Sequence, residues 1–181
     1  MSEELEVLKI DAERLRQAGI PYMVTGSVAM NHYAVPRMTR DIDLVVELSA
    51  PDVDRVWRLF EDDFYVDRQA VQRAVEFPAA FNTIHTALVV KVDVVVRRDT
   101  EYRRTEFERR RRFMIEGQEV FVVAPEDLIL SKLEWARDSK SVLQLADVRN
   151  LAECVVDLDR QYLAEWLERL GLSALYQEAT G

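Results

Sequence analysis

Cysteine is nearly absent from this chain of 181 residues. The single cysteine, Cys154, has no partner within the chain, so an internal disulfide is excluded and the sequence suits a reducing compartment. We expect Cys154 to be a small buried residue on a helix. Histidine is also scarce, and His32 and His85 show no metal-ligand spacing with the cysteine, so structural roles are expected for both.

Long hydrophobic runs and excess positive charge are missing too. The longest apolar run, around residues 89–96, contains Lys91 and Asp93 and is too short to span a membrane. The first residues, MSEELEVLKI, place no basic segment ahead of an apolar run, so we expect no signal peptide and a cytoplasmic protein. The formal net charge of -9 argues against a protein held to nucleic acid by its overall charge.

What the chain does contain is enough apolar sequence for a substantial core. Hydrophobic residues make up 49% and charged residues 31%, as is usual for a globular domain. Hydrophobic periodicity predicts a mixed α/β sheet flanked by helices, the α+β class, followed by a C-terminal helical bundle. We expect an α/β core over residues 1–124 and a helical region packed on it over residues 125–181. Strands are expected within 20–26, 41–48, 81–87, 88–97 and 113–123, and helices within 3–18, 27–35, 49–60, 68–77, 101–113, 125–140, 141–156 and 159–171, followed by a short tail.

Three aspartates on two expected strands are the first candidate for chemistry. In Asp41-Ile42-Asp43 the alternation of a strand points both carboxylates to one face and Ile42 into the core. Asp93 interrupts a valine-rich strand, where a lone carboxylate needs a partner or an ion. Like charges side by side are unfavourable for stability, whereas a divalent cation requires several hard oxygen ligands. The sequence therefore predicts a Mg²⁺ or Mn²⁺ site formed by these three residues.

A glycine-serine step precedes the aspartates. Gly26-Ser27 follows the apolar segment YMVT and opens an expected helix. Glycine would let the backbone approach a phosphate, and the free N–H groups of the helix with the Ser27 hydroxyl would receive it. Taken alone, Gly-Ser is more often a turn with a helix N-cap, and an Asp-x-Asp is as often a solvated strand edge. The ordered combination of the motifs favours a metal-dependent site that handles a nucleotide.

In this order, Gly26-Ser27, Asp41-Ile42-Asp43 and Val92-Asp93-Val94 resemble the nucleotidyltransferase superfamily of the DNA polymerase β type. The resemblance implies that the glycine-serine turn grips a nucleoside triphosphate and that the three aspartates are catalytic and hold two magnesium ions. The closer likeness is to small bacterial toxin nucleotidyltransferases of the abortive-infection AbiEii type, through the segments APEDLILSKLEWAR and LADVRNL. The interval before Asp41 is longer than in many members, because YAVPRMT intervenes.

The toxin-type resemblance also implies roles for basic residues. Its motif of a lysine followed five residues later by a basic residue matches Lys132 and Arg137, which would bind the nucleotide. Asp147 resembles the acid of the C-terminal motif, although an exposed helical aspartate is the expectation from the helix alone. Arg37 and Arg40, in the loop before Asp41, would either contact a phosphate, pair with an aspartate or remain solvated.

The cluster Arg109-Arg110-Arg111-Arg112 alternates with nearby glutamates, which favours a salt-bridged solvent face over a nucleic-acid surface. The leading hypothesis is a magnesium-dependent nucleotidyltransferase that moves a nucleoside monophosphate from a nucleoside triphosphate to a tRNA, a protein or a small molecule. It would act in the cytoplasm and, as a toxin, would pair with a cognate antitoxin. The alternatives are a non-catalytic nucleotide-binding or antitoxin-like module on the same fold, and a kinase-like or phosphohydrolase enzyme.

Overall fold

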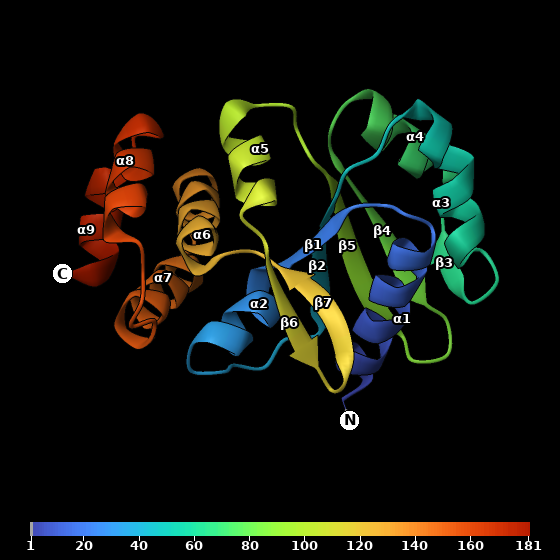
Figure 1. Cartoon of the computed structure of the whole chain (residues 1–181), viewed down its shortest axis with the longest axis horizontal. Coiled ribbons are helices and arrows are strands. Elements are labelled where there is room, and N and C mark those ends of the chain that lie inside the picture. The colour runs from blue at the N-terminus through green and yellow to red at the C-terminus, as the bar shows by residue number, and fades with distance from the viewer. Residues whose placement is uncertain (1) are drawn as a thin grey trace.

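The computed structural model describes residues 2–181, which fold around a seven-stranded mixed sheet (Figure 1). The strands are β1 Tyr22–Thr25, β2 Asp41–Val46, β3 Phe64–Val66, β4 Ala80–His85, β5 Val90–Val96, β6 Arg111–Ile115 and β7 Gln118–Val122. The helices are α1 Glu3–Gln17, α2 Gly26–Tyr33, α3 Val53–Phe60, α4 Arg68–Glu76, α5 Glu101–Glu108, α6 Pro125–Ser139, α7 Val142–Cys154, α8 Arg160–Arg169 and α9 Ser173–Thr180, with a 3-10 turn at Ala50–Asp52. The predicted class, a mixed sheet flanked by helices, is confirmed.

The strands lie in the order β3-β4-β5-β2-β1-β7-β6. β2 and β5 are parallel neighbours at the centre, whereas β1 runs antiparallel to β2 and β4 antiparallel to β5. The two expected strands at 81–87 and 88–97 thus form an antiparallel pair. This topology matters for the site because it brings two segments about fifty residues apart into direct register at the middle of the sheet.

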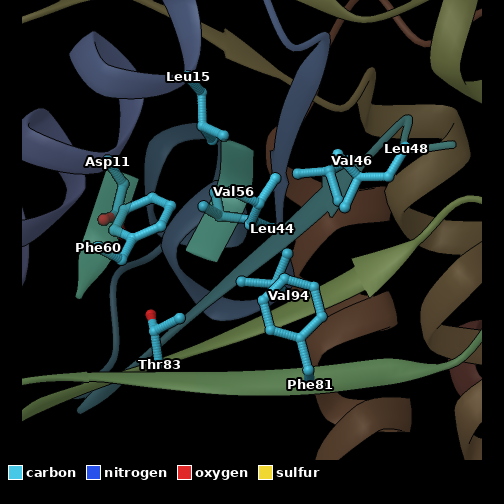
Figure 2. A pocket seen from close by; sticks show the side chains of 10 residues that line it. All are labelled: Asp11, Leu15, Leu44, Val46, Leu48, Val56, Phe60, Phe81, Thr83 and Val94. Atoms are coloured by element: carbon cyan, nitrogen blue, oxygen red, sulfur yellow. The ribbon is translucent and has the colours of Figure 1, made fainter. Parts of the chain in front are cut away.

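One face of the sheet carries the apolar core beneath α1 and α3. Ile42, Leu44 and Val46 of β2 point to this face and are buried. The 3-10 turn that leads into α3 is stabilised by a capping box between Ser49 and Asp52. A small cavity of about 10 Å³ remains between α1, α3 and the central strands (Figure 2).

A carboxylic acid lies at the edge of this apolar cavity (Figure 2). Asp11 of α1 is 1% exposed, and neither of its carboxyl oxygens has a hydrogen-bond partner. Burial raises the pKa of Asp11 well above its ordinary value, the charge of Arg14 opposes that rise, and the charge of Asp63 adds to it. An ionised carboxylate without partners is costly in an apolar interior, so Asp11 holds its proton far more tightly in the folded chain.

The opposite face is covered over only part of its width. α2 packs over β1 and β2, and the Tyr33 hydroxyl donates to the carbonyl of Val123 at 2.8 Å. Beyond α2, side chains on this face of β2, β5 and β4 reach solvent: Asp41, Asn82 and Val95 are exposed. This open half of the face is where the candidate site lies.

The C-terminal helices lie together at one end of the molecule (Figure 1). α6 begins at Pro125, which is favourable at the first helical turn, and buries Leu128, Ile129 and Leu133. Trp166 of α8 is buried as well and packs on Tyr102 of α5, with ring centroids 4.9 Å apart. A domain boundary at residues 124–125 stays a prediction.

Four local features differ from the expectations. Cys154, the last residue of α7, is exposed, and its thiol donates to Asn150 Oδ1 at 3.3 Å. The helix expected over 101–113 ends at Glu108, and Arg111 already begins β6. The expected tail after residue 171 forms α9, and β3, only three residues long, was not expected. None of the described helices combines the length and the apolar character needed to cross a membrane.

Candidate functional site

Two of the predicted aspartates face each other across the central strand pair. The parallel register of β2 and β5 sets Asp43 opposite Asp93, and Asp41 opposite Lys91. Alternation puts Asp41, Asp43, Lys91 and Asp93 on the same, open face of the sheet, with Ile42 and Val92 buried on the other. The structure therefore brings the three predicted residues to one place.

Lys91 pairs with two of these carboxylates. Its Nζ lies 2.8 Å from Oδ2 of Asp93 and 3.5 Å from Oδ2 of Asp41. The other oxygen of Asp93 is engaged by Asn82 on β4, whose amide nitrogen, turned toward it, donates to Oδ1 at 2.6 Å. Both oxygens of Asp93 thus have partners. The sequence placed Lys91 on the right face but gave no sign of these ion pairs, because they depend on the register of two strands.

Asp43 is in a different environment from its neighbours. Burial raises the pKa of Asp43, the charges of Asp93 and Asp41 raise it further, and Lys132 and a hydrogen bond from the Ser27 backbone N–H lower it. This N–H belongs to the first turn of α2, where the helix dipole also favours a negative charge. Burial and neighbouring like charges destabilise the ionised form of this carboxylate, and a bound cation would relieve that destabilisation.

Gly26 makes room for Asp43. Its backbone has φ +62, in the left-handed region, and a Cβ built there would overlap the Asp43 side chain. The expectation that Gly26 serves to let the backbone approach a phosphate is therefore incomplete. Glycine is needed first of all so that the turn and the Asp43 carboxylate can touch.

Ser27 joins a second polar network through its hydroxyl. Arg37 donates from Nη2 to Ser27 Oγ at 2.6 Å, and its guanidinium binds Asp147 through both carboxylate oxygens at 3.0 and 2.9 Å. Lys132 Nζ donates to Asp147 Oδ2 at 2.6 Å and to Gln144 Oε1 at 3.1 Å. Asp147 therefore holds two cations beside the glycine-serine turn.

The pKa values reflect this arrangement. Burial opposes ionisation of Asp147, but hydrogen bonds from Arg37 and Lys132 outweigh it and hold the pKa of Asp147 below its ordinary value. Burial lowers the pKa of Lys132, its ion pair with Asp147 opposes that, and the charge of Asp43 opposes it too. Ser27 links this network to the carboxylates, because its hydroxyl accepts from Arg37 and its backbone N–H donates to Asp43.

The expectation that Asp147 is an exposed helical aspartate was wrong, because its exposed fraction is 3%. A signal was present in the sequence: Asp147 lies one residue before Val148 and four before Leu151, on the stripe of α7 that becomes buried. An acid on such a stripe requires a buried partner, and here it has two.

Two predicted nucleotide-binding arginines lie away from this network. Arg40 is exposed. Arg137 pairs with its neighbour Asp138 at 3.1 Å and donates to the carbonyl of Leu170 at 3.4 Å. Residues five apart on a helix point about 140° from each other, so Lys132 and Arg137 face different sides of α6. The nucleotide-binding roles of Arg40 and Arg137 stay predictions.

The arginine cluster is salt-bridged, as expected, but it faces solvent only in part, because Arg112 is exposed whereas Arg109 is bound to buried acids. Arg109 binds the buried Glu126 and Asp127, both at 2.9 Å, and stacks on the ring of Tyr162. Arg103 similarly pairs with the buried Glu106 at 2.7 Å. These arginines tie α5 and β6 to α6 and α8, and this role in packing leaves little of their charge for nucleic acid.

The carboxylate oxygens of the site suit a divalent cation, which prefers hard oxygen ligands. Asp43 and Asp93 in register, with Asp41 two residues away, provide such donors. Among residues 2–181, however, no three acidic, histidine or cysteine side chains already stand in an arrangement that would hold a metal ion. The donor set fits the ion, but a rearrangement must accompany its binding.

Known proteins match this chain at the level of structure. No protein-family model matches the sequence, and a search of curated proteins finds no match either. Solved structures do match. The antibiotic-resistance factor ANT(2'')-Ia, solved in complex with adenylyl-2''-tobramycin, is 15% identical with a TM-score of 0.61, over 99% of this chain and 100% of that one.

Two further structures agree. An antigenic nucleotidyltransferase-like protein from Paracoccidioides brasiliensis is 19% identical with a TM-score of 0.59, over 97% of this chain and 92% of that one. A lincosamide antibiotic adenylyltransferase, solved with lincomycin bound, is 13% identical with a TM-score of 0.53, over 86% and 99% of the two chains. These likenesses confirm that the chain has the predicted nucleotidyltransferase-like fold. The closer likeness to AbiEii-type toxins stays a prediction.

Proposed function

We propose that this protein is a metal-dependent nucleotidyltransferase that moves a nucleoside monophosphate from a nucleoside triphosphate to an acceptor. The observation that carries the proposal is the meeting of Asp43 and Asp93 in register, with Asp41 beside them, against the Gly26-Ser27 turn. The fold shared with adenylyltransferases supports the same chemistry. A purely structural role gives no reason for three acids on one open sheet face.

The triphosphate would lie between the turn and the neighbouring cations. Ser27 is the second residue of α2, which begins directly after β1, and backbone N–H groups and a hydroxyl are available there to phosphate oxygens. Arg37 and Lys132, held next to Ser27 by Asp147, would neutralise phosphate charge. Phosphoryl chemistry depends mainly on such positioning and charge neutralisation.

Asp41, Asp43 and Asp93 would hold the magnesium or manganese ions. When bound, such ions supply positive charge that activates an attacking oxygen and stabilises a leaving one. In the balanced reaction the acceptor oxygen bonds to the α-phosphorus, the bond from that phosphorus to the bridging oxygen breaks, and pyrophosphate leaves. The acceptor proton would pass to one of the two solvent-accessible carboxylates, Asp41 or Asp93, whose side chains are 53% and 26% exposed.

The acceptor is proposed only as a hydroxyl-bearing molecule: a small molecule, a protein or a tRNA end. The net charge of -9 disfavours nucleic acid, and the arginines that would offset it are paired with buried acids. A role as the toxin of a toxin–antitoxin pair belongs to the same proposal. A small helix-turn-helix protein encoded beside this chain would support that role.

The test is to incubate the protein with each α-labelled triphosphate, magnesium and cell extract, and to separate labelled RNA, protein and small molecules. We expect one labelled class with the wild type. Asp43→Asn should lower the labelling at least about 100-fold, because a metal ligand contributes several kcal/mol to the transition state. If no condition gives labelling, while the protein binds a partner tightly, a non-catalytic module replaces the enzyme.

A further inference from the structure

The side chain of Lys91 stands where a cation is needed. Lys91 lies on β5, two residues before Asp93 and opposite Asp41 of β2. Its ammonium contacts Asp93 at 2.8 Å and Asp41 at 3.5 Å, so one positive charge bridges two of the three acids. No step of the proposed reaction uses this lysine.

These contacts conflict with metal binding by the same acids. Asp93 has Asn82 on one oxygen and Lys91 on the other, which leaves neither oxygen free of a hydrogen-bonding partner. A divalent ion and an ammonium a few ångströms apart repel each other, and the repulsion is stronger near a protein surface than in bulk water.

We propose that Lys91 is a built-in counter-ion that competes with the divalent metal for Asp41 and Asp93, so that metal binding requires its displacement. The inference rests on the proposed function, because it concerns the metal ligands of that site. Without metal, Lys91 neutralises the acids and keeps the open face of the sheet intact. With metal, its side chain leaves the acids.

Lys91 is free to make that movement. Its side chain is 38% exposed, and the acids it binds are 53% and 26% exposed, so it swings into solvent without disturbing the core. Ion pairs at this exposure are weak, so a divalent ion with several carboxylate ligands displaces the lysine readily. Displacing the lysine therefore costs little free energy, but the cost still changes the affinity for the metal by a measurable amount.

The experiment is calorimetric titration of the nucleotide-free protein with Mn²⁺, comparing wild type, Lys91→Met, Lys91→Arg and Arg58→Met. Methionine keeps much of the length of lysine without its charge. Arginine keeps the charge at the same position. Arg58, exposed on α3 over the far face of the sheet, provides the matched loss of one positive charge at a distance from the acids.

We expect Lys91→Met to bind Mn²⁺ at least about tenfold more tightly than the wild type, and both Lys91→Arg and Arg58→Met to stay within about twofold of it. Equal or weaker binding by Lys91→Met, including no measurable binding, would overturn the proposal. So would an equal gain in Arg58→Met, because it would make the effect one of net charge. Absence of nucleotide transfer in the wild type would refute the proposed function while leaving this result intact.

Discussion

At the scale of single residues, the site depends on a contact that glycine alone permits. Gly26 has a positive φ and touches the Asp43 side chain, which also accepts the Ser27 N–H. The sequence suggested glycine for its freedom near a phosphate. The structure adds that the glycine and the central acid are packed together, so a change at either position alters the other.

Gly26→Ala tests this contact, and Gly19→Ala is its matched control. Gly19 has φ +65, nearly the same as Gly26, but nothing lies within 4 Å of a Cβ built there. Both variants should lose about 1 kcal/mol of unfolding free energy from the left-handed backbone. Gly26→Ala should lose at least about 1 kcal/mol more from overpacking, and should bind Mn²⁺ about tenfold more weakly because Asp43 is displaced.

Denaturant unfolding and Mn²⁺ titration measure the two effects separately. If Gly26→Ala matches Gly19→Ala in unfolding free energy and in Mn²⁺ affinity, the contact with Asp43 contributes to neither. Glycine at position 26 would then be required only by the turn.

Single residues also show which features of the site could be predicted from the sequence. The faces of Asp41, Asp43 and Asp93 follow from strand alternation, which is a local rule, and they were predicted. The ion pairs of Lys91 follow from the register of β2 against β5, which no local pattern encodes. The burial of Asp147 was encoded in its helical stripe but was misjudged, because an acid was assumed to be solvated.

At the scale of elements, Asp147 connects three helices near the site. From α7 it holds Lys132 of α6, and through Arg37 it reaches Ser27 at the start of α2. The C-terminal helices therefore do more than cover the core: they fix the position of two cations at the glycine-serine turn.

Asp147→Asn should destabilise the protein by about 3 kcal/mol, because removing one partner leaves the charge of Lys132 buried and uncompensated. Asp138→Asn, which changes an exposed acid on α6, is the control and should be nearly neutral. Urea unfolding at constant pH measures both. Equal stability of the two variants would mean that the network is held by other contacts.

The sequence predicts some helices and strands better than others. The central strands β1, β2 and β5 have strong apolar patterns and were predicted. β3 has three residues and depends on pairing with β4, so its sequence alone carries too little signal. The helix expected to continue to residue 113 stops at Glu108, because Arg109 and Arg111 turn toward the buried Glu126. Tertiary ion pairs overrode a local helical preference there.

At the scale of the whole molecule, the stability of the fold should depend on the proton held by Asp11. Its folded pKa lies well above the ordinary aspartate value of about 4. Above that pH the unfolded chain releases the proton while the folded chain keeps it. Proton binding therefore favours the folded state at low pH, and this contribution is lost as the pH rises toward the folded pKa.

Asp11→Asn removes this dependence. The stability of the variant relative to the wild type should increase as the pH rises from 4 to 7, by up to about 1.4 kcal/mol per pH unit. Asp62→Asn, an exposed neighbour of Asp63, should show no such trend. Unfolding free energies measured across this range decide the matter, and parallel curves for wild type and Asp11→Asn would contradict the assignment of a buried neutral acid.

The central claim is that the site directs attack at the α-phosphorus of a nucleoside triphosphate. The most direct measurement compares transfer from triphosphates labelled at the α- and γ-positions, with the wild type and Asp43→Asn, in magnesium and an acceptor-containing extract. We predict incorporation of α-label only, together with release of pyrophosphate, and loss of both in the variant. Incorporation of γ-label would indicate a kinase, and release of inorganic phosphate without incorporation would indicate a phosphohydrolase. Either result would contradict the account.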